Sequence, residues 1–408
     1  MASGNTRRIA FFGLFGGGNV GNEGSLAAAI DAVRTRDAAT DIVVVCARPA
    51  AVAMEHGVRA VPISMAGRLA ALDSAPRPIR MLVRPITEVA RWVAAFRFVR
   101  SVDAIVVPGT GILDDFGESW HQMPYAQFRW STAARLARRP WMMVGVGAGP
   151  IDHRVSRWLM RRTVRNSRTI TYRDEGSRAF MAGIGVPSPA TSVQPDLAFA
   201  LPRPADRRPP DHTGTDVGLG VMAYYGWRND PADGEDGFDR YVDAMTEIAG
   251  RLLARGHTIR VLVGAPSDQA AVERVVAALE RDHPEAVAAA LTITPIKSFA
   301  ELLDEVARTD VVVGTRYHNV IAGLMMSRPT VAVAYAGKFR DVMAQFGLDD
   351  FCHDVDELVA DAVVADIETV LARSSEIAAQ LDRHNRRYSR AVADRFDAVF
   401  DDVLGGDR

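Results

Sequence analysis

Three side chains that suit the binding of a small anion follow two neighbouring predicted strands late in the chain. A β-branched run over 310–314 predicts a buried strand, and Arg316 and His318 come directly after it at the start of an apolar helix. A second strand, 330–334, is followed by Lys338, one of two lysines in a chain otherwise rich in arginine. Ligands bind at the carboxyl ends of strands in open α/β sheets, so we expect these cations to hold a doubly charged ligand there. The structural alternative is that Arg316 caps a turn and His318 packs in the core.

A glycine-rich turn follows the first predicted strand, 7–13. Glycines let the backbone approach a ligand closely, and Asn19, Asn22 and Glu23 add short polar groups suited to sugar hydroxyls. Helix capping is the alternative role, and it suits Asn22 well. The turn also matches the dinucleotide pattern G-x-G-x-x-G, but the acidic residue expected after the second strand is missing. Arg48 stands near that position and would tolerate NADP, so a reductase remains an alternative.

Two more strands of the first half end in polar residues. The strand 103–107 leads to Asp114 and Asp115, either of which can orient an acceptor hydroxyl, act as a base or cap the next helix. The strand 168–172 leads to Arg173, a candidate for binding phosphate or carboxylate, and to Asp174, which we expect to cap a helix. No cluster has the spacing of metal ligands, and no nucleophile elbow or P-loop is present.

Composition is that of a globular protein, with 48% hydrophobic and 24% charged residues. The two cysteines, Cys46 and Cys352, are far apart and predict a reducing compartment without disulfides. We find no apolar run long enough for a membrane span and no signal-peptide pattern, and therefore expect a cytoplasmic protein.

The net charge of −2 conceals an asymmetry between the two halves. Residues 1–210 hold 28 Arg against 16 Asp and Glu, a net of +12, and the remainder is −14. Arginines recur on one helical face over 154–168, and the segment 77–100 mixes arginines with aromatic residues. These surfaces either are solvated and pair with the acidic half, or make peripheral contact with an anionic membrane at its inner face. No nucleic-acid-binding module surrounds them, and no nucleic-acid partner is expected.

Strands alternate with helices throughout, which predicts an α/β protein with parallel sheets. Further strands are expected at 41–46, 141–146, 216–223, 258–263 and 290–294. We divide the chain into an N-terminal Rossmann-like domain (1–200, acceptor side), a proline-rich linker (201–213), a C-terminal Rossmann-like domain (214–374, donor side) and a helix (375–408) returning toward the N-terminal domain. Two such domains facing a central cleft constitute the GT-B arrangement.

Six segments occur in the order and approximate spacing of the polysaccharide pyruvyl transferase family, which the chain resembles over roughly 10–350. They are 16–26, 109–115, 144–151, 172–177, 194–199 and 314–338. The resemblance implies a GT-B-like fold without a cofactor, and transfer of a pyruvyl unit from phosphoenolpyruvate to two hydroxyls of a sugar as a cyclic ketal. It implies donor-binding groups at Arg173, Arg316, His318 and Lys338, and acceptor contacts in the first glycine-rich turn, which contains Asn19, Gly21 and Asn22.

The residue types suit this chemistry. Fixed cations can hold the phosphate and carboxylate of phosphoenolpyruvate, and His318 is the natural acid for protonating its methylene carbon. Asn22 stands where the family usually has Asp. Because an amide cannot act as a base, we expect Glu23, Asp114 or Asp115 to accept the hydroxyl proton.

Two alternatives remain open: a GT-B nucleotide-sugar glycosyltransferase, and a catalytically silent carbohydrate-binding relative, which Asn22 would fit. The expected acceptor is a sugar of a bacterial cell-surface glycan or glycolipid. The sequence does not determine the identity of the acceptor, or whether it is free, nucleotide-linked or lipid-linked. It also leaves open the choice between 4,6- and 3,4-ketals and the oligomeric state.

Overall fold

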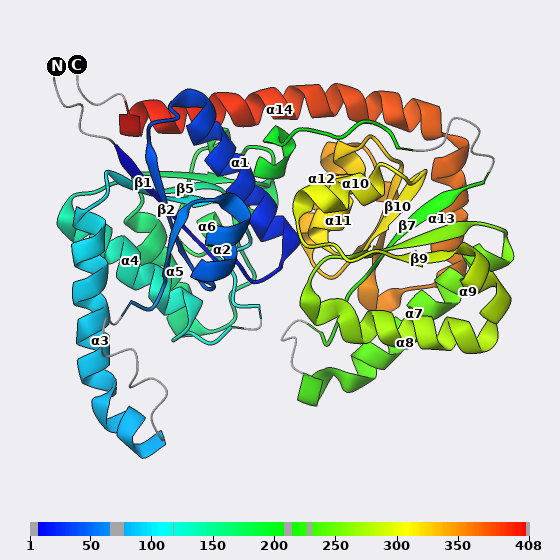
Figure 1. Ribbon diagram of the computed structural model, residues 1–408, viewed down its shortest axis with the longest axis horizontal. Coiled ribbons are helices and arrows are strands. Elements are labelled where there is room, and N and C mark those ends of the chain that lie inside the picture. Colours follow the sequence, from blue (N-terminus) through cyan, green and yellow to red (C-terminus); the bar gives the residue numbers. More distant parts are fainter. Residues whose placement is uncertain (1–6, 66–76, 117, 208–213, 227–230, 405–408) are drawn as a thin grey trace. The chain divides into compact units, whose positions relative to one another are not determined.

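The computed structural model describes residues 7–65, 77–116, 118–207, 214–226 and 231–404, and the chain divides into two compact units (Figure 1). Unit 1 comprises residues 1–17, 25–197 and 392–408, and unit 2 comprises 18–24 and 198–391. The short segment 18–24 thus groups with unit 2, although its neighbours on both sides belong to unit 1. Of the predicted linker 201–213, residues 208–213 lie outside the described residues.

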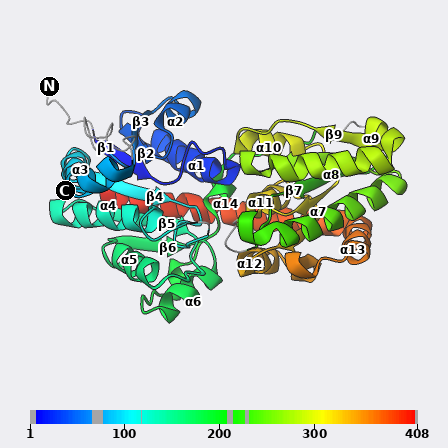
Figure 2. The same cartoon turned by 90° about the horizontal axis from the view of Figure 1, so that it is seen from below.

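Unit 1 contains a parallel sheet of six strands in the order β3-β2-β1-β4-β5-β6. Its strands are β1 (Arg8–Phe12), β2 (Asp41–Cys46), β3 (Arg59–Pro62), β4 (Ala104–Pro108), β5 (Trp141–Val146) and β6 (Thr169–Tyr172). Its helices are α1 (Val20–Arg36, whose first turn belongs to unit 2), α2 (Pro49–His56), α3 (Arg77–Arg100), α4 (Met123–Ala137), α5 (Arg154–Arg165) and α6 (Glu175–Gly183). Helix α1 covers one face of the sheet, and α4 and α5 cover the other (Figure 2).

Unit 2 repeats the pattern with a parallel sheet in the order β12-β11-β10-β7-β8-β9. Its strands are β7 (Asp216–Val221), β8 (Thr258–Val263), β9 (Leu291–Ile293), β10 (Val311–Gly314), β11 (Thr330–Ala334) and β12 (Cys352–Asp354). Its helices are α7 (Pro231–Ala254), α8 (Gln269–Asp282), α9 (Pro284–Ala290), α10 (Phe299–Val306), α11 (Tyr317–Met325), α12 (Gly337–Gln345) and α13 (Ala360–Ala372). Helix α14 (Ser374–Leu404) begins in unit 2 and ends in unit 1.

The structure confirms the ten predicted strands to within two residues at each end. Strands β3 and β12 were not predicted from the sequence. Both are short edge strands, of four and three residues, and each contains exposed positions, so neither shows the continuous apolar run of a central strand. The arginine-bearing helix predicted over 154–168 ends at Arg165.

Each unit is built around its own aromatic core. In unit 1 the rings of Trp130 and Trp141 lie 5.8 and 5.2 Å from that of Phe12. In unit 2 Phe199 stacks on Phe346 at 5.5 Å. Burying one such side chain contributes about 1.5–3 kcal/mol. The two cysteines are buried, one in each unit, and both act as small core residues.

Candidate active site

The two strands predicted to carry the site are neighbours in unit 2. β10 pairs in parallel with β11, and Gly314, the last residue of β10, lies opposite Ala332. The turns that follow them therefore emerge at the same edge of the sheet, where α11 and α12 begin. This carboxyl-end edge of unit 2 carries Arg316, His318 and Lys338.

Arg316 is held by a carboxylate. Its Nε donates to Oδ2 of Asp268 at 3.1 Å, and its Nη2 donates to Oδ1 of the same residue. Asp268 is fully buried and also accepts a bond from the backbone N–H of Ala223. Burial lowers the pKa of Arg316, but the Asp268 carboxylate more than offsets this, so the guanidinium stays charged. Among the described residues no hydrogen bond uses Nη1, which leaves one edge of the guanidinium open to a ligand.

Lys338 stands at the start of α12 beside three aromatic rings. Its Nζ lies 4.6 Å from the ring centroid of Tyr335, and 5.9 and 6.0 Å from those of Tyr317 and Phe339. Tyr335 also interacts electrostatically with Arg316. The aromatic rings fix the ammonium by cation–π attraction without neutralising its charge.

His318 lies on the first turn of α11 and is buried. Its ring meets the rings of Phe299 and Tyr317 edge to face, at 6.0 and 5.3 Å. The backbone of Gly21 lies against the same ring, since a Cβ added to Gly21 would stand 1.8 Å from Nδ1 of His318. Any residue larger than glycine at position 21 must therefore displace the imidazole.

The segment 18–24, which carries predicted acceptor contacts, packs within unit 2. The backbone N–H of Val20 donates to the carbonyl of Gly264 at 3.3 Å. Asn19 caps α1, because its side-chain oxygen accepts bonds from the N–H groups of Gly21 and Asn22. The expectation that Asn22 suits the cap is therefore wrong. Asn19 directly precedes the helix, whereas Asn22 already lies in its first turn.

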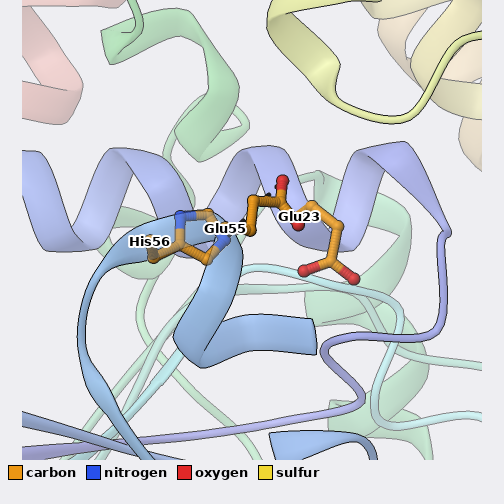
Figure 3. Close-up of side chains that lie close together, drawn as sticks. All are labelled: Glu23, Glu55 and His56. Carbon is orange, nitrogen blue, oxygen red and sulfur yellow. Dashed lines mark ion pairs between the residues drawn. The ribbon is translucent and has the colours of Figure 1, made fainter. Parts of the chain in front are cut away.

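Glu23, a predicted base, is buried near the start of α1. Figure 3 shows it with Glu55 and His56 of α2, and single ligand atoms of the three residues lie within 4.8 Å of one another. Spacing along the sequence does not reveal the group, because α2 lies some thirty residues further on.

Arg173 follows β6 in unit 1 and is buried between two carboxylates. Its Nε lies 3.5 Å from Asp174 and its Nη1 lies 3.9 Å from Asp196. Gly147 lies against the guanidinium, which a Cβ at that position would approach to 2.6 Å. Asp174 caps α6, as predicted, by accepting the N–H of Ser177 at 2.6 Å.

The two candidate aspartates after β4 differ in their surroundings. Both carboxylate oxygens of Asp115 accept backbone N–H groups, from Asp152 at 3.0 Å and from His153 at 2.9 Å. Asp115 therefore fixes a loop. Asp114 accepts a hydrogen bond from the backbone N–H of Phe116 at 3.3 Å and is half-buried. Because both of its oxygens are engaged, Asp115 is the less suited of the two to contact a ligand.

Two residues that position the unit 2 cations were not predicted from the sequence. Asp268 orients Arg316, and Tyr335 packs against Lys338. The signal for Asp268 was present, because the turn after β8 reads Gly264–Asp268 and repeats the strand-to-glycine pattern seen elsewhere. The ion pair itself joins residues 48 positions apart and requires β8 and β10 to be brought near each other by β7.

The chain is similar in sequence to proteins of one known family. The sequence model of the family described as polysaccharide pyruvyl transferase matches residues 42–337. Among curated proteins, the amylovoran biosynthesis protein AmsJ of Erwinia amylovora is 24% identical over 296 residues, covering 70% of this chain and 69% of that protein.

Solved structures of low sequence identity share the fold. The UDP-GlcNAc 2-epimerase of Neisseria meningitidis superposes with a TM-score of 0.60 at 8% identity, covering 98% of this chain and 100% of that one. Anabaena Alr3699/HepE superposes with a TM-score of 0.59 at 12% identity, covering 97% and 100%. The fold is therefore GT-B-like, as predicted.

Proposed function

Because this chain belongs to the polysaccharide pyruvyl transferase family, we propose that it transfers the pyruvyl unit of phosphoenolpyruvate to two hydroxyls of a sugar in polysaccharide biosynthesis. The observation that carries the proposal is the presence of two cationic side chains, Arg316 and Lys338, at the carboxyl-end edge of unit 2. Tyr335 interacts with both of them, because its ring centroid lies 4.6 Å from Nζ of Lys338 and it interacts electrostatically with Arg316.

These groups suit a donor with two anionic ends. The open Nη1 edge of Arg316 can donate two hydrogen bonds to a carboxylate or phosphate. Lys338 adds a point charge, and in the described part of the chain no hydrogen bond uses the N–H groups of Gly337 and Lys338 at the start of α12. Asp268 neutralises part of the charge of Arg316. Because the net positive charge at this edge is then small, it favours binding of one small dianion over a larger polyanion. Arg173, in unit 1, stays a predicted donor contact.

The proposed reaction conserves atoms and charge. His318 delivers a proton to the methylene carbon of phosphoenolpyruvate, which leaves an oxocarbenium-like C2. One sugar hydroxyl attacks C2 and loses its proton to a base. A second hydroxyl then displaces phosphate and gives its proton to the leaving phosphate. The base returns the first proton to His318, so the products are the cyclic ketal and inorganic hydrogen phosphate.

Glu23 and Asp114 are the proposed bases. Glu23 lies two residues from Gly21, which contacts His318, and Asp114 follows β4 of unit 1. Asp115 is the weaker candidate, since both its oxygens are already engaged.

A thermal-shift experiment tests the donor. We expect phosphoenolpyruvate to raise the unfolding temperature, because a ligand at about 100 times its Kd stabilises the native state by about 2.7 kcal/mol. UDP, GDP and NADP should have no such effect. Replacing Lys338 with glutamine should remove most of the shift, and Lys297→Gln is the matched control because it changes the other lysine of the chain. A shift with UDP alone would favour the glycosyltransferase alternative.

Turnover is tested by phosphate release from phosphoenolpyruvate in the presence of candidate sugars. Release that depends on an acceptor supports the transferase. If phosphoenolpyruvate binds and no acceptor in a broad panel releases phosphate, the silent carbohydrate-binding alternative gains support.

The outer face of α3 supports contact of unit 1 with an anionic membrane. Ile86, Val89 and Val93 are 61%, 63% and 42% exposed, and the same face continues to exposed Arg97 and Arg100. Figure 1 shows α3 extending beyond the other helices of unit 1. None of the helices in the described ranges is long and apolar enough to cross a bilayer. We propose that this face lies on anionic lipid, with the apolar side chains immersed and the arginines at the phosphates. The acceptor would then be lipid-linked.

Vesicle co-sedimentation tests this contact. Changing Arg97 and Arg100 to glutamine should weaken binding to vesicles of equal parts phosphatidylcholine and phosphatidylglycerol by roughly thirtyfold, at about 1 kcal/mol for each charge. Changing Ile86, Val89 and Val93 to serine should weaken it as strongly. Leu136→Ser, an exposed leucine on α4, serves as control. Equal sedimentation of all variants, or equal binding to phosphatidylcholine alone, would contradict the proposal.

A further inference from the structure

Unit 1 contains a cavity that the proposed donor site does not use. Its volume is about 600 Å³, within the range of about 300–1,000 Å³ that small-molecule sites span. One wall is the carboxyl end of the unit 1 sheet, from Cys46 of β2 to Ser64 after β3. The other walls are α3 and the segment from Glu118 to Arg129, and we call this space the α3–α4 cavity.

Three arginines and two glutamates line the α3–α4 cavity. Glu88 accepts a hydrogen bond from Arg91 at 3.2 Å and another from Arg129 at 3.0 Å. Arg129 is nearly buried and also donates to the backbone carbonyl of Ile63. Arg91 and Arg129 thus share one carboxylate, and Arg84 adds a further guanidinium to the lining. A neutral ligand with many hydroxyls can form hydrogen bonds with the planar carboxylate and guanidinium edges of these side chains.

Aromatic side chains supply flat apolar surfaces in the same cavity. Trp120 lines it and is 40% exposed, and its ring meets that of His121 at 5.5 Å. Tyr125 lines it as well, and its hydroxyl accepts a bond from Nε1 of Trp92 at 3.1 Å. A large aromatic residue left exposed in a cavity is unusual for core packing, and it can stack on the C–H face of a sugar ring.

Glu118 contributes a carboxyl group with a buried oxygen to the lining of the α3–α4 cavity. It accepts the backbone N–H of Met123 at the start of α4, whereas its Oε2 is buried and has no hydrogen-bond partner among the described residues. Burial raises the pKa of this carboxyl, although the Met123 bond and His121 oppose the rise. An unsatisfied buried oxygen is costly unless a ligand supplies the donor.

We propose that the α3–α4 cavity binds a neutral sugar residue of the acceptor, stacked on Trp120 and donating hydroxyl hydrogen bonds to Glu118. The statement that this sugar is the acceptor rests on the proposed function. Binding of a sugar to the cavity is independent of it. The α3–α4 cavity belongs to unit 1, whereas the proposed donor-binding cations Arg316 and Lys338 belong to unit 2.

Saturation-transfer NMR on the full chain tests the site, with methyl glycosides of glucose, galactose, mannose and N-acetylglucosamine as probes. We expect at least one glycoside to receive saturation, most strongly at its ring C–H protons. Trp120→Ala should weaken its binding about tenfold or more, and Trp120→Phe should retain much of it. Trp158→Ala is the matched control, since Trp158 is 49% exposed on α5 and does not line the cavity. Glu118→Gln should weaken binding without lowering the unfolding temperature.

The outcomes separate the two proposals. If Trp120→Ala loses the glycoside signal and keeps the thermal shift with phosphoenolpyruvate, the cavity site is supported. A second outcome is that phosphoenolpyruvate shifts the unfolding temperature of neither the wild-type chain nor any variant, while glycoside binding still depends on Trp120. In that case the proposed function fails and the sugar site is supported. If no glycoside binds, or if Trp120→Ala and Trp158→Ala bind equally well, the cavity proposal is overturned.

Discussion

His318→Gln is expected to lower kcat by roughly 10²–10⁴-fold, the usual range for the loss of a general acid. Glutamine can fill the space between Gly21, Phe299 and Tyr317 but cannot deliver a proton. Binding of phosphoenolpyruvate should change much less than turnover. The measurement is steady-state phosphate release, together with the thermal shift produced by phosphoenolpyruvate.

A structural role for His318 makes a different prediction. If the imidazole only packs, the glutamine variant should lose thermal stability and retain near-normal turnover at low temperature. His353→Gln is the control, because His353 is a half-buried histidine of the same unit that pairs with Asp366 at 2.9 Å. For a true acid, turnover in D₂O should place deuterium in the new methyl group with the wild-type chain, and His318→Gln should slow this step.

Arg316→Lys is expected to raise the KM for phosphoenolpyruvate by roughly 10–150-fold. Arginine binds Asp268 through Nε and Nη2 and still presents Nη1, whereas one ammonium cannot serve both partners with the same geometry. The lost charge-assisted hydrogen bonds are worth about 1.5–3 kcal/mol, which corresponds to this range. Lysine keeps a positive charge beside the buried Asp268, so the variant should still fold. Replacement by an uncharged residue would strand that carboxylate at a cost of about 3–5 kcal/mol.

Arg328→Lys is a matched control for this variant. Arg328 is a nearly buried arginine of unit 2 that also forms a two-pronged ion pair, with Asp206, at 3.3 and 2.9 Å. Lysine there should lower stability in a similar way and leave the KM for phosphoenolpyruvate unchanged. If both variants raise KM equally, Arg316 acts through the stability of unit 2 and does not bind the donor.

The strands were readable from the sequence because central parallel strands are buried on both faces. The run at 310–314 is apolar at nearly every position, and β10 is completely buried. β3 and β12 were missed because an edge strand has a neighbour on one side only, so its sequence is short and partly polar. The residue at which a helix begins was harder to predict than the position of a strand. Asn19 and Asn22 are both good capping residues, and the position at which the helix begins decides between them.

The sequence by itself determined the two parallel α/β sheets, the family, and the strand ends that carry Arg316, His318 and Lys338, because these features depend on local apolar runs and on glycine-rich turns. Only the tertiary structure decided their partners: Asp268 against Arg316, Tyr335 against Lys338, and Gly21 against His318. It also revealed the α3–α4 cavity. The physical reason is that ion pairs, ring contacts and cavities join residues distant in sequence, and strand order and register set which of them meet.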